Sequence, residues 1–110
     1  MMRGYTTLEQ SKKLSEILPL KSADMHYERV YFEGKQSDWF VKLGTPIKSD
    51  DIIPCWSLSA LLSVYPMVVG RDMDMYCCWQ NSKNLYSRHY DNPVDACYEM
   101  VLKLKEKNLL

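Results

Sequence analysis

The sequence predicts an α+β fold in which two hairpins form a small antiparallel sheet of about four strands, with three helices packed mainly on one face. Two observations indicate this class. Three segments show helix start signals or apolar side chains at helical spacing, and two pairs of β-branched and aromatic segments flank turn-forming residues. They follow one another in the order α-β-β-α-β-β-α, and we expect a single domain over residues 1–110.

The first helix is signalled close to the amino terminus. Thr6 and Thr7 can each cap a helix, because an acidic or amide side chain follows three residues later in a reciprocal capping arrangement. These partners are Glu9 and Gln10. The helix should end before Pro19, which cannot continue the backbone hydrogen-bond ladder.

The first hairpin is expected from two segments rich in β-branched and aromatic residues, 27–32 and 39–43. Residues 34–37 between them contain glycine and serine and should form the turn. Because side chains alternate between the two faces of a strand, one set in the second segment should point toward the core. That set is Trp39, Val41 and Leu43.

The second helix is expected between Pro54 and Pro66, after a polar loop at residues 48–51. Pro54 suits the first turn of a helix, where its missing amide donor costs little, and Pro66 ends the helix. Apolar residues repeat at three and four, while Ser57, Ser59 and Ser63 mostly occupy other faces and no charge is present, so neighbouring elements should cover this helix. The apolar positions are Leu58, Leu61, Leu62 and Tyr65.

The second hairpin should pair residues 75–80 with residues 85–90 through a turn at 81–84. Residues 67–69 could add a short strand before it. The last helix has the clearest signals, because Asn92 can cap it and Pro93 suits its first position. Its apolar stripe is Val94, Cys97, Tyr98, Val101 and Leu104.

Ten residues lie on the apolar side of their elements, and we expect most of them to be buried. They are Trp39, Val41, Leu43, Leu58, Leu61, Leu62, Val94, Cys97, Val101 and Leu104.

Composition and charge exclude several classes of protein. Hydrophobic residues make up 46% of the chain and charged residues 25%, which is typical of a folded domain. Fourteen basic residues balance fourteen acidic ones, so we expect no nucleic-acid partner. No apolar run approaches the roughly 20 residues that a membrane span requires, and we expect a cytoplasmic protein. Its four cysteines, which lack paired spacings, should then be free thiols.

Two segments of the chain have a recognisable sequence. They are Ile53-Pro54-Cys55-Trp56-Ser57-Leu58-Ser59-Ala60-Leu61-Leu62 and Asn92-Pro93-Val94-Asp95-Ala96-Cys97 continuing to Leu110. The chain resembles a group of small uncharacterised proteins that are encoded by gut anaerobes and by their phages or other mobile elements. The resemblance implies a shared single-domain fold and an accessory role in a mobile element, and it transfers no catalytic residue.

The chain shows no established pattern of catalytic, metal or cofactor residues. His26, His89 and the cysteines lack the C-x-x-C or H-x-x-x-H spacing that lets one turn supply two zinc ligands. A cysteine-histidine site could be built from Cys77 or Cys78 with His89 on the partner strand, but a position inside a strand offers nothing that lowers a thiol pKa. We therefore predict no catalytic residue, no metal ligand and no cofactor.

The unusual feature is the aromatic content, with eight tyrosines and three tryptophans. On the last strand, alternation puts Tyr86, Arg88 and Tyr90 on one face, pointing away from the helices. They could be ordinary cross-strand pairs of an exposed sheet, or a contact surface for a protein partner or a second copy, because Tyr and Arg concentrate interface energy. We therefore expect a non-enzymatic binding or protein-interaction module, which could self-associate. The alternative is a small cysteine/histidine enzyme or a metal-binding protein using Cys77, Cys78 and His89.

Overall fold

The computed structural model describes residues 3–110, which form three α-helices, two short 3₁₀ helices and eight strands in three antiparallel sheets. The α-helices are α1 (Leu8–Ser15), α2 (Leu58–Leu62) and α3 (Pro93–Glu106), and the 3₁₀ helices are η1 (Leu20–Ser22) and η2 (Asn81–Lys83). The strands are β1 (Met25–Glu28), β2 (Tyr31–Phe32), β3 (Lys35–Gln36), β4 (Phe40–Leu43), β5 (Ile52–Cys55), β6 (Val68–Asp72), β7 (Met75–Gln80) and β8 (Leu85–Tyr86).

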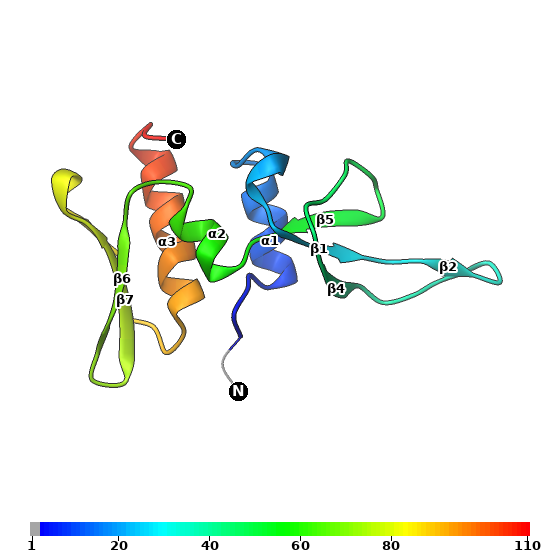
Figure 1. Ribbon diagram of the computed structural model, residues 1–110, viewed down its shortest axis with the longest axis horizontal. Coiled ribbons are helices and arrows are strands. Elements are labelled where there is room, and N and C mark those ends of the chain that lie inside the picture. Colours follow the sequence, from blue (N-terminus) through cyan, green and yellow to red (C-terminus); the bar gives the residue numbers. More distant parts are fainter. Residues whose placement is uncertain (1–2) are drawn as a thin grey trace.

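The α+β class is confirmed, but the single four-stranded sheet is wrong. The helices lie between two separate three-stranded sheets, β4-β1-β5 on one side and β6-β7-β8 on the other (Figure 1). The first sheet packs on α1 through β5, and the second packs on α3 through β7. The helices therefore cover one face of each sheet and not one face of a single sheet. The molecule measures 52 × 32 × 19 Å.

The first sheet contains the predicted hairpin and one strand that the sequence did not indicate. Strand β1 is central, and Tyr27 lies opposite Val41 on β4 and Ile53 on β5. The prediction that Pro54 begins the second helix is wrong, because Pro54 lies in β5. A proline is tolerated there because β5 is an edge strand, and the backbone nitrogens on its outer side have no neighbouring strand to which an N–H would donate.

The first hairpin continues beyond its sheet as a narrow arm formed by β2 and β3 (Figure 1). The chain reverses at Glu33 and Gly34, whose φ angles of 50° and 78° are those of a tight hairpin turn. The predicted turn at residues 34–37 thus begins one residue earlier. Its last residues belong to β3 and to the connection that follows.

Helix α1 begins as predicted and is shorter at its end. The Thr7 hydroxyl accepts a hydrogen bond from the Gln10 backbone N–H, and the Gln10 side chain accepts one from the Thr7 N–H. The helix ends at Ser15, and the chain after it still buries Leu18. Helix α2 begins later than predicted, because Ser57 caps it by accepting from the Ala60 N–H.

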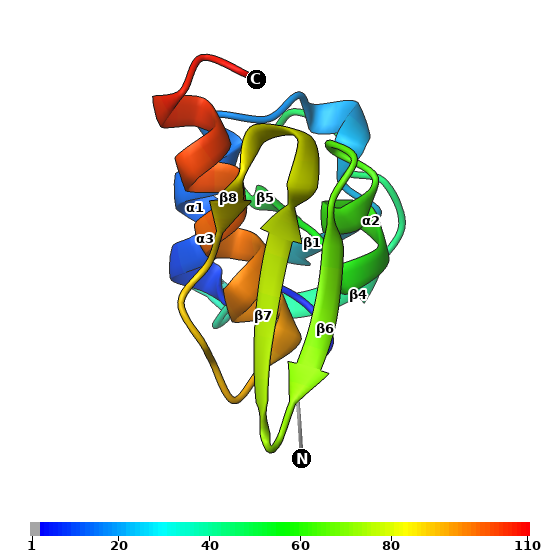
Figure 2. The same cartoon turned by 90° about the vertical axis from the view of Figure 1, so that its left-hand side faces the viewer.

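The second sheet lies in front of the helices when viewed from its own side of the molecule (Figure 2). Its hairpin turn is where the sequence predicts it, with Asn84 in the left-handed conformation after η2. The short strand expected at residues 67–69 is present but begins at Val68, and this strand, β6, extends to Asp72. Val69 of β6 lies opposite Cys78 of β7, and both face the helices.

Helix α3 follows its sequence signals closely. The Asn92 side chain accepts a 2.8 Å hydrogen bond from the Val94 N–H, and Pro93 occupies the first turn. The buried set on this helix contains four of the five residues of the predicted stripe, and Tyr98 is half-buried.

The structure buries half of the ten predicted core residues completely and most of the others in part. Five are buried and four are half-buried. Leu43 is 83% exposed, so its predicted inward position is wrong. Leu43 does share a face with buried Met25 on β1, but β4 is an edge strand and no helix of residues 3–110 covers its end.

Candidate functional site

The cysteines proposed for catalysis lie in surroundings that disfavour a thiolate. Cys78 is completely buried against α3, and its hydrogen bond with Cys97 and its burial raise the pKa of its thiol. Cys77 points to the other face of β7, with its sulfur 3.4 Å from the Ser87 carbonyl oxygen. His89 is exposed. The hydrogen bonds of the Cys77 sulfur go to Cys78 and Ser87, so within residues 3–110 no hydrogen bond joins this thiol to His89 as a nucleophile to its base.

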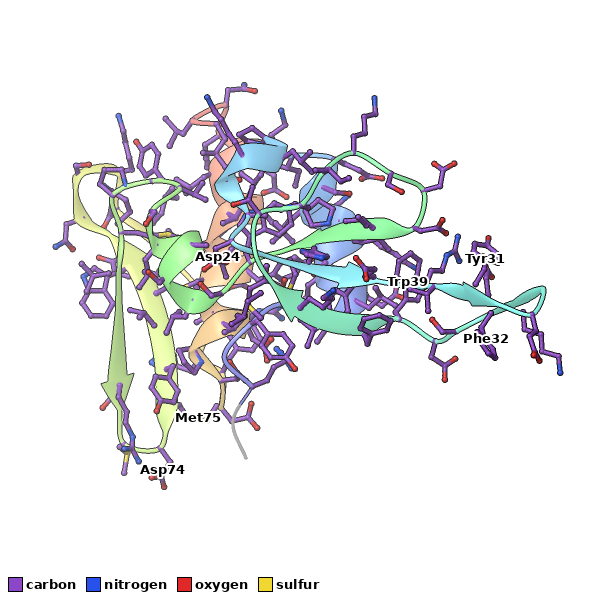
Figure 3. The ribbon with its side chains drawn as sticks, turned by 45° about the vertical axis from the view of Figure 1, so that its right-hand side comes forward. Asp24, Tyr31, Phe32, Trp39, Asp74 and Met75 are labelled. Atoms are coloured by element: carbon purple, nitrogen blue, oxygen red, sulfur yellow. The ribbon has the colours of Figure 1, made fainter. Side chains whose placement is uncertain are left out.

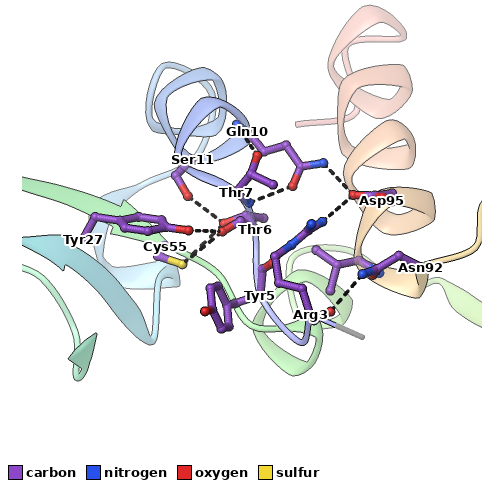
Figure 4. A network of polar contacts seen from close by, with 11 residues as sticks. Arg3, Tyr5, Thr6, Thr7, Gln10, Ser11, Tyr27, Cys55, Asn92 and Asp95 are labelled. Carbon is purple, nitrogen blue, oxygen red and sulfur yellow. Dashed lines mark hydrogen bonds and ion pairs between the residues drawn. The ribbon is translucent and has the colours of Figure 1, made fainter. Parts of the chain in front are cut away.

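The remaining cysteine belongs to a buried polar cluster beneath the first sheet (Figure 4). Thr6, Ser11 and Cys55 are each 0% exposed, and the Thr6 hydroxyl lies 2.7 Å from the Ser11 hydroxyl and 3.6 Å from the Cys55 sulfur. Burial raises the pKa of the Cys55 thiol, although its hydrogen bonds with Thr6 and Ser11 oppose the shift. Cys55 is therefore a protonated packing residue.

Tyr27 completes this cluster by donating a 2.8 Å hydrogen bond to the Thr6 carbonyl oxygen. Burial, with the nearby Cys55 and Tyr5, raises the pKa of Tyr27 to about 12. A group that stays protonated at neutral pH can hold the chain in place but cannot act as a base. The cluster holds the amino-terminal segment against β5, where the Thr6 N–H donates to the Trp56 carbonyl oxygen.

The same segment also joins the two halves of the molecule (Figure 4). The Asp95 carboxylate on α3 accepts hydrogen bonds from Arg3 at 2.6 Å and from Gln10 of α1 at 2.8 Å. Asn92 donates to the Arg3 carbonyl oxygen. Every charged group in this network has a partner, so the network stabilises the fold and leaves no charge free for a ligand.

Metal binding has no support in the geometry of the described chain. Within residues 3–110, no group of three or more histidine, cysteine, aspartate or glutamate side chains could hold a metal ion. The buried side-chain nitrogen and oxygen atoms of this part all have hydrogen-bond partners.

The predicted surface of Tyr86, Arg88 and Tyr90 is divided by a β-bulge. Tyr86 lies opposite Trp79, whereas Tyr90 lies opposite Tyr76. Three steps along β7 therefore correspond to four steps along its partner, so the partner holds one extra residue. The extra residue reverses the alternation of faces. The expectation that the three side chains share one face is therefore wrong.

Ser87 makes the bulge possible by replacing part of the backbone ladder. Its hydroxyl accepts a 2.9 Å hydrogen bond from the Cys78 N–H, and its own N–H donates to the Cys78 carbonyl oxygen. Beyond it, Tyr90 turns toward α3 and donates to Glu99 at 3.1 Å. Arg88 also binds Glu99, through its side chain at 2.7 Å and through its backbone N–H. Tyr86 alone stays on the outer face, 52% exposed.

The bulge leaves Tyr86 in a row of apolar side chains that crosses the sheet. Val68 on β6 lies opposite Trp79 on β7, and Trp79 lies opposite Tyr86 on β8. We call these three residues the outer row. Val68 and Tyr86 are each 52% exposed, and Trp79 is half-buried. The row faces away from the helices, because the neighbouring Val69 and Cys78 pack against them.

A pocket of about 340 Å³ opens beside the outer row. Trp79 and Val68 form one part of its wall, and Gln80 and Pro66 form another. Gln80 is fixed there because its side-chain amide donates a 2.8 Å hydrogen bond to the Pro66 carbonyl oxygen. The outer row thus combines exposed apolar side chains with a concave edge, which suits contact with another protein.

Sequence reasoning found Tyr86 but missed its two partners in the outer row. Trp79 lies on the same face of β7 as Met75 and Cys77, because side chains alternate along the strand. The three residues could have been linked if the strands on both sides of β7 had been recognised in the sequence. The strand that contains Val68 was expected to be only three residues long, which is too short to set its pairing with Trp79.

In the comparisons with known proteins, no protein-family model, curated protein or solved structure matches the chain. Within residues 3–110, no helix is both long enough and apolar enough to cross a membrane.

Proposed function

We propose that the protein is a non-enzymatic protein-interaction module that binds a partner through the outer row of Val68, Trp79 and Tyr86. One observation carries this proposal: three large side chains cross an open sheet face in register, and two of them are half exposed. Tryptophan and tyrosine dominate the energetic centres of protein interfaces, because they offer large rigid surfaces with one polar group.

The charge balance supports a protein partner. Fourteen basic and fourteen acidic residues leave no net field that would attract a nucleic acid or an anionic membrane. The charged side chains beside Tyr86 are also engaged, since Lys103 donates to the Tyr86 carbonyl oxygen and Arg88 binds Glu99. In the cytoplasm of its host, such a module could serve as an accessory protein of a mobile element, as the sequence resemblance implies.

The alternative remains a small enzyme or metal protein that uses Cys77, Cys78 and His89. The raised pKa of the Cys78 thiol argues against it, because a nucleophilic cysteine needs a lowered value. Elemental analysis of the purified protein, together with thiol titration of the folded state, separates the two functions. Bound metal or a single hyper-reactive thiol would favour the alternative.

Affinity capture from the native host tests the proposal directly. Val68→Ser and Tyr86→Ser change exposed side chains, so both variants should stay folded while losing the protein that the wild-type chain retains. Ile47→Ser is the matched control, because Ile47 is an apolar side chain that is 69% exposed on the connection between β4 and β5, away from the outer row. Retention of the same partner by the Val68→Ser/Tyr86→Ser double variant would rule out the outer row as the binding site.

A further inference from the structure

The first sheet has an open edge at β4. The Gly44 N–H donates to the Asp24 carbonyl oxygen at 2.9 Å, which makes this pair a hydrogen-bonded position of the β1–β4 ladder. Hydrogen-bonded positions alternate along an antiparallel pair, so the N–H and C=O groups of Val41 and Leu43 point away from β1. No strand of residues 3–110 pairs with that side of β4. An edge of this kind can accept a strand from another chain.

The other edges of the two larger sheets are less suited to pairing. Strand β5 contains Pro54, which has no N–H to donate. Strand β6 has Gly70 at its centre, and glycine weakens a strand interior. Strand β8 is only two residues long. Strand β4 contains neither proline nor glycine, so all of its outward-facing backbone groups are able to pair with another strand.

Strand β4 carries apolar side chains that are typical of a strand covered by a neighbouring strand, although here they are exposed. Leu43 is 83% exposed and Phe40 is 39% exposed. Val41 and Leu43 lie on the α1 side of the sheet, since they are opposite Tyr27 and Met25, and Trp39 continues this face by alternation. The edge therefore exposes an apolar stripe together with unpaired backbone groups.

Symmetry decides which partner and which register fit this edge. A two-fold axis perpendicular to the sheet pairs β4 with β4 of a second copy and keeps the α1 side on one face. A centre at any residue preserves the alternation of side chains, and the two middle residues of β4, Val41 and Lys42, are the centres that pair most of the strand. A centre at Lys42 places two lysines directly opposite each other, which is destabilising.

A centre at Val41 avoids that repulsion and uses the exposed side chains. It places Leu43 opposite Trp39 of the second copy, and Lys42 opposite Phe40 of the second copy, where an ammonium group can lie against an aromatic ring. Val41 then exchanges two backbone hydrogen bonds with Val41 of the second copy. We propose that the protein forms a two-fold dimer through antiparallel pairing of β4, centred on Val41.

The hairpin arm adds to the area of this contact. A stable interface buries about 800 Å² per partner, more than a four-residue strand supplies by itself. Because the strands are antiparallel, each arm extends past the Leu43 end of the other copy and lies beside its body. Tyr31 and Phe32 are 60% and 74% exposed on this arm, and Figure 3 shows them on opposite sides of it. Whichever side of the arm faces the second copy, one of these aromatic side chains therefore adds apolar surface to the contact.

Sedimentation equilibrium of the purified full chain tests the dimer. The wild-type protein should have twice the chain mass of 12.9 kDa, and Leu43→Lys should reduce the mass to 12.9 kDa. Leu43 is so exposed that its replacement cannot unfold the monomer by itself. Val41→Pro should give the same halving, because the Val41 N–H points away from β1 and only the second copy uses it. A wild-type mass of 12.9 kDa at the highest attainable concentration would overturn the proposal.

Val68→Lys is the matched control, since Val68 is also an exposed apolar residue but lies on the second sheet. It should leave the mass at the dimer value, and dissociation by Val68→Lys in place of Leu43→Lys would assign the contact to the outer row and overturn the β4 dimer. The dimer uses a different surface from the proposed partner site. A variant that loses the host partner but keeps the dimer mass contradicts neither proposal and assigns the partner to the outer row. A variant that loses the dimer mass but keeps the host partner assigns the dimer to β4, so failure of one proposal can be told from failure of the other.

Cysteine cross-linking tests the register. A Val41→Cys variant should form an inter-chain disulfide on mild oxidation, because the Cα atoms of a hydrogen-bonded antiparallel pair are about 5.5 Å apart, within disulfide range. A Lys42→Cys variant should not cross-link. Efficient cross-linking through position 42 and none through position 41 would overturn the Val41-centred register.

Discussion

The indole ring of Trp79 lies directly over Gly70 on the neighbouring strand. A Cβ atom at position 70 would come within 2.6 Å of a carbon of that ring, closer than non-bonded atoms approach. The absence of a side chain at Gly70 therefore lets Trp79 lie flat on the outer face, between Val68 and Tyr86. The shape of the outer row depends on this one glycine.

Gly70→Ala should destabilise the protein by roughly 1–3 kcal/mol, because the added methyl group forces Trp79 or the backbone to move. The free energy of unfolding in urea measures this loss, and tryptophan fluorescence should shift as the ring becomes more exposed. Gly4→Ala is the control, since nothing lies within 4 Å of a Cβ built at Gly4. Equal stability of the Gly70→Ala variant and the wild type would contradict the packing described.

Glu99 should make stability depend on pH. Burial opposes its ionisation, but hydrogen bonds from Arg88 and Tyr90 outweigh this and hold the pKa of Glu99 below its usual value. The ionised form therefore stabilises the folded state above pH about 4.3, the ordinary glutamate value, and this contribution is lost as the pH falls through the lower folded value. Glu99→Gln should lower the free energy of unfolding at pH 7 by on the order of 1 kcal/mol.

The difference between the Glu99→Gln variant and the wild type should disappear in acid, when Glu99 is protonated. Glu9→Gln is the matched control, because the Glu9 carboxylate is exposed and its contact with Lys12 is 3.8 Å long. Its stability should follow the wild-type profile. A Glu99→Gln variant whose deficit is the same at every pH would show that the lost interactions are not those of the ionised carboxylate.

Thiol labelling of the folded protein should modify Cys77 alone. The other three cysteines are 0% exposed, and all four are free thiols. Mass spectrometry after brief alkylation should find one added group, and alkylation in denaturant without reductant should find four. A Cys77→Ser variant should take up none while folded. Rapid labelling of a second thiol would instead support the cysteine-based alternative function.

Thr6→Val should destabilise the protein although it keeps the shape of the side chain. The Thr6 hydroxyl is buried, and it accepts a 3.1 Å hydrogen bond from the Trp56 N–H. A valine leaves that buried N–H without its partner, which costs about 1–3 kcal/mol. Thr45→Val, at an exposed position, is the control and should leave the thermal midpoint nearly unchanged. Equal midpoints for the two variants would mean that the hydroxyl does not stabilise the amino-terminal segment.

Features that depend on a few consecutive residues were predictable. The capping box at Thr7, the cap at Asn92 and the left-handed turn ending at Asn84 each involve side chains and backbone groups within four residues of one another. Their physical causes are complete within the segment, so sequence spacing is enough to recognise them.

Features that depend on what lies across from a residue were not predictable. Pro54 has a residue type that suits a helix start and an edge strand equally, and only the pairing of β5 with β1 decides between them. Leu43 and Val41 follow the same alternation, yet only the position of α1 leaves Leu43 exposed. For the candidate site, Tyr86 was placed correctly, and the bulge at Ser87 moved Tyr90 to the opposite face.

The sequence by itself determined the α+β class, the free cysteines and the beginnings of α1 and α3, because each follows from composition or from interactions along the chain. The tertiary structure decided that two sheets enclose the helices and that Val68, Trp79 and Tyr86 form one row. Strand pairing joins residues distant in sequence, and one extra residue on one strand reverses every side chain beyond it. No local pattern carries that information.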